Sequence, residues 1–213
     1  MMAQKDPNLR SIINRAHFAA PDGMPLVWAL RSFGARRQMR VYGPNLMFAL
    51  CERAALCGHR VFLYGSTSQT LAHLEQRLRS SCPGLQIVGS RADLFRPLTE
   101  SENAKVRKAI LDSRCDLLFV GLGEPKQNRW MADNRTSLPG IVMVGVGAAF
   151  DFHAGRVRQA PEWMQNSGLE WLFRLLQEPK RLAKRYLLIT PPFLPLWAMQ
   201  WIRMQYFQSS DAR

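Results

Sequence analysis

Acidic residues are scarce in this chain of 213 residues, which has 16 aspartates and glutamates against 29 lysines and arginines. The formal net charge of +13 favours an anionic partner, which can be nucleic acid, acidic lipid head groups or a phosphate-bearing substrate. Charge alone does not choose among these partners. The sequence contains no nucleic-acid recognition module, so we expect no nucleic-acid partner.

Metal and cofactor motifs are also missing. None of the four cysteines belongs to a Cys-X-X-Cys pair, and the four histidines show no matching ligand spacing, which argues against a zinc site. A Walker A loop is absent, and so is the Asp-X-Asp motif that commonly holds a metal in nucleotide-sugar enzymes. We therefore expect no cofactor and no bound metal, with the cysteines present as free thiols in a reducing compartment.

The beginning of the chain has no apolar leader. Residues 1–6 read Met-Met-Ala-Gln-Lys-Asp and contain no signal-peptide core. We expect a cytoplasmic protein.

Strand and helix patterns alternate through the middle of the sequence. Short apolar runs predict strands at 60–65, 85–89, 116–121 and 140–145, and longer periodic segments predict helices at 67–80 and 100–111. Continuous apolar strands are typical of a parallel sheet covered on both faces. The pattern predicts an α/β fold, a Rossmann-like parallel sheet with helices on both faces, in a core of residues 1–165.

The composition changes in residues 166–213. An aromatic apolar helix is predicted at 169–176, followed by a basic turn with Lys180, Arg181, Lys184 and Arg185. Residues 186–202 carry no charge, and three prolines interrupt them. This pattern favours a helical appendage that lies on a membrane. The alternative is a terminal helix packed on the core, with a solvated basic face.

Glycines end three of the predicted strands, at Gly65, Gly121 and Gly145. Ligands of open α/β sheets bind beyond the carboxyl ends of the strands, and glycine lets a phosphate approach the backbone. Each glycine alone is more simply a turn residue, but three in one sheet favour a nucleotide or another phosphate ligand. Phe150 stands where a dinucleotide fingerprint needs glycine or alanine, which argues against a dehydrogenase.

Asp22 follows the short apolar run 17–20 and precedes a predicted helix at 25–33. A carboxylate at a strand end is well placed for acid–base chemistry. The alternative is that Asp22 only caps the helix.

These segments together resemble the WecG/TagA/CpsF family of glycosyltransferases. The resemblance rests on Asp-Gly-Met at 22–24, Val-Phe-Leu-Tyr-Gly at 61–65, Gly-Leu-Gly-Glu-Pro-Lys-Gln at 121–127, Gly-Val-Gly-Ala-Ala-Phe-Asp at 145–151 and the segment 168–181. It implies an inverting, metal-independent transfer of a sugar, often of the N-acetylmannosamine type, from a UDP-sugar to an undecaprenyl-diphosphate-linked acceptor. Such transfer belongs to the synthesis of cell-surface polysaccharide or of the teichoic acid linkage.

The resemblance also implies residue roles. Asp22 matches the family's candidate general base, and Gln127 matches a glutamine of the active-site pocket. Arg174, Arg181 and Lys184 match basic appendage residues that reach the diphosphates. The implied location is peripheral, on the inner face of the cell membrane with its anionic surface. A homo-oligomer is compatible with the sequence.

The chain departs from the family pattern at several positions. Asn128 stands where the family has glutamate, Gln159 replaces an arginine, and Lys184 replaces another. The family pattern also begins with a strand carrying Thr-X-Asn, and this chain opens after that strand. A second hypothesis is therefore a truncated, inactive relative that acts as a binding or scaffold subunit.

Overall fold

The computed structural model describes residues 2–184 and 191–210. The side chains of Arg181, Lys184 and residues 206–210 lie outside the described part. The chain divides into two compact units, of which one contains residues 43–159 and the other contains residues 1–42 together with 160–213.

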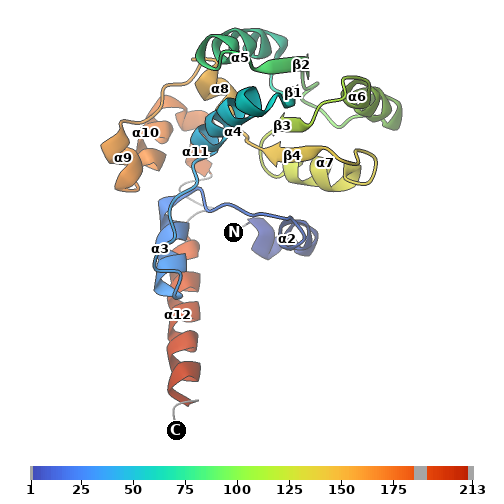
Figure 1. The fold of residues 1–213 in the computed structure, drawn as a ribbon. Coiled ribbons are helices and arrows are strands. Elements are labelled where there is room, and N and C mark those ends of the chain that lie inside the picture. Colours follow the sequence, from blue (N-terminus) through green and yellow to red (C-terminus); the bar gives the residue numbers. More distant parts are fainter. Residues whose placement is uncertain (1, 185–190, 211–213) are drawn as a thin grey trace. The chain divides into compact units, whose positions relative to one another are not determined.

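The unit of residues 43–159 is built on a parallel sheet (Figure 1). Its strands are β1 (Arg60–Gly65), β2 (Gln86–Arg91), β3 (Leu117–Gly121) and β4 (Val142–Gly145), in the order β2-β1-β3-β4. All three neighbouring pairs are parallel. The predicted α/β class with a parallel sheet is confirmed. The apolar runs at β1 and β3 are buried strands, as expected, but β4 is partly exposed.

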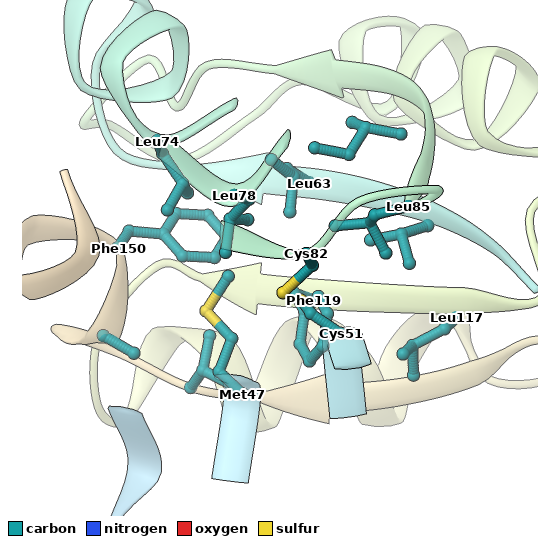
Figure 2. Packing of buried hydrophobic residues seen from close by; sticks show 14 of the residues in the cluster. Met47, Cys51, Leu63, Leu74, Leu78, Cys82, Leu85, Leu117, Phe119 and Phe150 are labelled. Atoms are coloured by element: carbon teal, nitrogen blue, oxygen red, sulfur yellow. The ribbon is translucent and has the colours of Figure 1, made fainter. Parts of the chain in front are cut away.

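Side chains of the two central strands alternate between two apolar clusters, as the period of two along a strand requires. Leu63 and Phe119 face the cluster that α4 and α5 cover, which Figure 2 shows together with Met47 and Leu74. Tyr64 and the other alternate residues face the second cluster. Both faces of the two central strands are therefore buried, whereas the edge strands β2 and β4 are partly exposed. The carboxyl ends of the strands remain for a ligand site.

Five helices of this unit connect the strands or flank them. They are α4 (Gly43–Cys57), α5 (Ser68–Ser81), α6 (Glu100–Asp112), α7 (Lys126–Asn134) and α8 (Ala149–His153). Thr67 caps α5 by accepting from the Thr70 amide, and Thr99 forms a capping box with Glu102 at the start of α6. These caps set the starts of α5 and α6 within one residue of the predicted positions.

The other unit consists of helices from both ends of the chain. They are α1 (Met2–Lys5), α2 (Pro7–Asn14), α3 (Met24–Ser32), α9 (Glu162–Asn166), α10 (Glu170–Gln177), α11 (Pro179–Lys184) and α12 (Phe193–Ser210). The expected division into residues 1–165 and 166–213 differs from this grouping. The difference has a physical cause: the Trp28 ring packs on Gly168, and the Trp197 indole donates to Ser32 Oγ at 2.8 Å.

The helix α12 begins after Pro191 and Pro192 and continues through Pro195 without a break. The expectation that all three prolines interrupt this segment is therefore wrong. Pro195 lies in the first turn, where the missing N–H would have no partner within the helix. Within the described ranges, no helix is both long and apolar enough to cross a membrane.

Candidate active site

Gly65 and Gly121 lie side by side at the carboxyl ends of β1 and β3. A Cβ on Gly65 would come within 2.5 Å of the carbonyl carbon and oxygen of Gly121. A Cβ on Gly121 would come within 2.6 Å of the Phe150 ring. Both glycines are thus required by packing, whether or not a phosphate approaches the backbone there. Phosphate binding at these strand ends stays a prediction.

Gln127 is 4% exposed and joins two segments near the end of β4. Its Oε1 accepts from the Gly147 amide at 3.0 Å, and its Nε2 donates to Glu124 Oε1 at 3.0 Å. A Cβ on Gly145 would come within 3.1 Å of the same Nε2. Gln127 therefore fixes the turn after β4 relative to the start of α7, and its amide already has protein partners.

Asn128 donates to the second carboxylate oxygen of Glu124 at 2.7 Å. Glu124 thus accepts from two neighbouring amides, Gln127 and Asn128. A glutamate at position 128, as in the family pattern, would place two carboxylates together and could donate only when protonated. The departure at Asn128 is therefore accommodated locally by the hydrogen bond to Glu124.

The sequence interpretation missed an ion pair at the same edge of the sheet. Lys126 Nζ lies 2.7 and 2.8 Å from the two oxygens of Asp93, whose side chain is 4% exposed. The Asp93 amide also donates to the Ser66 carbonyl at 2.9 Å. These bonds join the segments that follow β1 and β2 to the start of α7. Nothing in the sequence pairs a lysine with an aspartate 33 positions away.

Asp22 belongs to the other unit and lies in a network of charged side chains. Arg40 Nη2 is 3.2 Å from Asp22 Oδ1 and 2.5 Å from Glu170 Oε2. Arg40 Nε also donates to the backbone carbonyl of Asp22. The Arg40 guanidinium lies 4.3 Å from the centre of the Tyr42 ring. One arginine therefore holds two carboxylates and is itself fixed by an aromatic ring.

The environment of Asp22 favours its neutral form more than water does. Burial raises the pKa of Asp22 above its ordinary value, Arg40 lowers it and Glu170 raises it, and the net direction is upward. The side chain is nevertheless 60% exposed, so an acceptor hydroxyl can reach it. An exposed carboxylate with a raised pKa is suited to accept a proton. Burial and the nearby Glu170 carboxylate likewise raise the pKa of Tyr42.

Two expectations about Asp22 need correction. Residues 17–22 are irregular, so Asp22 does not end a strand. Gly23 is the N-cap of α3 and no side chain caps that helix, so the capping role is also wrong. A cavity of about 1100 Å³ lies in the other unit among α4, α5 and α8, and Asp22 is not one of its lining residues.

Arg174 is the one basic appendage residue of the three whose side chain the structure describes, and it lies in α10. Its positive charge lowers the pKa of Asp22. The structure thus brings Arg174 near Asp22, as a shared site requires. Arg181 and Lys184 belong to α11, but their side chains lie outside the described residues.

Arg40 and Glu170 are functional candidates that the sequence interpretation did not single out. Glu170 was present only as part of the family motif at 168–181. Arg40 is one of four arginines in the segment 31–40, and no local signal distinguishes it from the others. Their contact joins positions 130 residues apart, which no local pattern could predict.

No group of three or more histidine, cysteine, aspartate or glutamate side chains that could hold a metal occurs among the described residues.

The family model of the WecG/TagA/CpsF glycosyltransferases matches residues 1–206. This match spans nearly the whole chain, both compact units included. The chain therefore belongs to the WecG/TagA/CpsF glycosyltransferase family, whose members act in the synthesis of cell-surface polysaccharides.

Proposed function

We propose that this glycosyltransferase transfers a sugar of the N-acetylmannosamine type, or a related sugar, from a UDP-sugar to an undecaprenyl-diphosphate-linked acceptor. Transfer inverts the anomeric configuration and needs no metal ion. The observation that carries the proposal is the exposed Asp22 carboxylate, held by Arg40 beside Glu170 and Arg174. Membership in the family supports the sugar donor and the lipid-linked acceptor in general terms.

In the proposed reaction, an oxygen of the acceptor attacks the anomeric carbon as UDP leaves from the opposite face. A bond forms between the acceptor oxygen and the anomeric carbon, and the bond to the β-phosphate oxygen breaks with its electron pair. Asp22 takes the proton of the attacking hydroxyl. General base catalysis of this kind contributes about 10²–10⁴-fold to the rate.

The leaving diphosphate gains negative charge as this bond breaks. Fixed cations and backbone amides stabilise such charge without reorganising during the reaction. We assign this role to Arg174, Arg181 and Lys184, and we assign the backbone at Gly65, Gly121 and Gly145 to the nucleotide. We assign Gln127 the role of holding the turn at Gly147 in place.

The proposed location is the inner face of the cell membrane. There the enzyme can contact the head group of a lipid-linked acceptor. Residues 166–213 form the membrane-associating appendage. The exposed apolar side chains of α10 and α12 support this location, among them Trp171, Leu176 and Trp201. A basic segment next to exposed aromatic side chains suits a surface of anionic lipids.

A donor screen tests the proposed activity. Radiolabelled UDP-sugars are incubated with the full chain and a prenyl-diphosphate-linked acceptor in detergent, and labelled lipid is extracted. We expect transfer from one UDP-sugar, with N-acetylmannosamine as the first candidate, and none without acceptor. Absence of transfer from every donor would favour the second hypothesis, an inactive binding or scaffold subunit.

A further inference from the structure

A short basic turn follows α3 and carries Arg36 and Arg37. The helix ends just before Gly34, which has a φ of 102°, a conformation that glycine adopts without strain. Arg31 Nε donates to the Gln38 carbonyl at 2.8 Å and closes the turn. The turn is therefore held by its own hydrogen bonds.

The turn presents positive charge without nearby acid in the sequence. Residues 31–40 contain four arginines and no aspartate or glutamate. Arg36 and Arg37 are both exposed, and neither guanidinium forms a hydrogen bond or an ion pair with any residue that the structure describes. Two adjacent exposed arginines without acidic neighbours attract an anionic surface.

The helix α12 lies beside α3 at this point. The Trp197 indole donates to Ser32 Oγ at 2.8 Å, and Ser32 lies two residues before Gly34. Figure 1 shows α12 continuing beyond the end of α3. Past this contact, α12 exposes 53% of Met199, 44% of Trp201 and 50% of Ile202. The exposed apolar part of α12 therefore begins just after its contact with the end of α3. The basic turn begins at the same end of α3.

We infer that the Arg36–Arg37 turn and the exposed side chains Met199, Trp201 and Ile202 of α12 form one composite surface for a bilayer of anionic lipids. The arginines contact lipid phosphates, and the apolar side chains enter the head-group region, where tryptophan is favoured. The inference rests on the membrane location proposed above. It adds that the N-terminal part of the chain shares in docking, while Trp197 holds the two helices together.

The chemistry of this surface favours lipid over other anionic partners. Arg203 is the single charged residue of α12, so most of the helix offers no contacts to a phosphate backbone. Exposed Met199 and Ile202 gain little from nucleic acid, but they lose contact with water in the interfacial region of a bilayer.

The test is co-sedimentation of the full chain with vesicles of phosphatidylglycerol and phosphatidylcholine, and with vesicles of phosphatidylcholine alone. The test variant is Arg36→Gln/Arg37→Gln. The matched control is Arg53→Gln/Arg135→Gln, which removes two exposed arginines from the other unit. A third variant, Trp201→Ser/Ile202→Ser, removes apolar contacts.

We expect Arg36→Gln/Arg37→Gln to lower partitioning onto anionic vesicles by about 10- to 30-fold and to leave binding to neutral vesicles unchanged. The control should lose far less, and the apolar variant should lose binding to both kinds of vesicle. Equal losses of vesicle partitioning in the test and control variants would overturn the inference. The appendage of residues 166–213 would then be the membrane anchor without the Arg36–Arg37 turn. Absence of vesicle binding by the unmodified chain would overturn the membrane location as well, whereas transfer in detergent tests the activity separately.

Discussion

Asp22 and Glu170 share one guanidinium, so the protonation of Asp22 depends on both of these neighbours. Arg40 lowers the pKa of Asp22, while Glu170 raises it, and burial outweighs Arg40. A general base works only when it is deprotonated, so these neighbours set the pH at which activity begins. The two neighbours should therefore shift the pH profile in opposite directions.

Replacing Arg40 by glutamine removes a positive charge next to Asp22 and should raise the pKa of Asp22 further. The rising limb of kcat/KM against pH should then move to higher pH. Glu170→Gln removes a negative charge and should move the same limb to lower pH. The measurement is kcat/KM for the UDP-sugar and acceptor across the acidic range, where the limb reports the free enzyme.

Arg40→Lys keeps the positive charge, so the rising limb of its kcat/KM profile should lie closer to that of the unmodified enzyme than the limb of Arg40→Gln does. Arg96→Gln, which breaks an exposed pair with Glu102 in the other unit, serves as the control and should leave the profile in place. Shifts of the same sign in Arg40→Gln and Glu170→Gln would show that Asp22 does not titrate in the limb.

At the scale of the elements, the neighbouring ends of β1 and β3 come too close for side chains. Gly65 has a φ of 129°, and its Cα faces the backbone of Gly121. That backbone cannot move aside as a flexible side chain would. Backbone conformation and packing both exclude alanine there.

Gly65→Ala should therefore lower the free energy of unfolding by at least about 2 kcal/mol. Gly58→Ala is the matched control, because Gly58 also has a positive φ, 70°, but nothing lies within 4 Å of a Cβ there. The control should cost only about 1 kcal/mol. Urea denaturation of the full chain measures both, and equal costs would show that the contact with Gly121 contributes nothing.

The elements were predictable where a local pattern decides them. The apolar run at β1 gave a strand with the predicted bounds, and Thr99 with Glu102 marks the start of α6. The strand end expected before Asp22 was wrong, because the run at 17–20 has no neighbouring strand. The charge network around Arg40 depends on the fold, since Glu170 is 130 residues away.

At the scale of the whole molecule, the proposed site residues fall into two groups. The strand-end glycines and Gln127 belong to the unit of residues 43–159, while Asp22 and Arg174 belong to the other unit. The family model extends across both units. In the proposed function, the first group contacts the nucleotide, while Asp22 and Arg174 of the second group serve the proton transfer and the leaving diphosphate.

UDP should bind the full chain equally well with EDTA and with added Mg²⁺. The physical reason is that protein cations take the place of a metal in neutralising the diphosphate, in line with the net charge of +13. Isothermal titration calorimetry measures the affinity under both conditions. A loss of UDP affinity in chelator would contradict the metal-independent mechanism.

Asp22 is proposed as the general base of sugar transfer, and the turnover of Asp22→Asn at saturating donor and acceptor tests this role. Asp112→Asn, an exposed aspartate of α6 paired with Lys108, is the matched control. We predict that Asp22→Asn lowers turnover by about 10²-fold or more, with UDP-sugar affinity nearly unchanged, while the control keeps full turnover. Turnover of Asp22→Asn close to that of the unmodified enzyme would contradict the assignment.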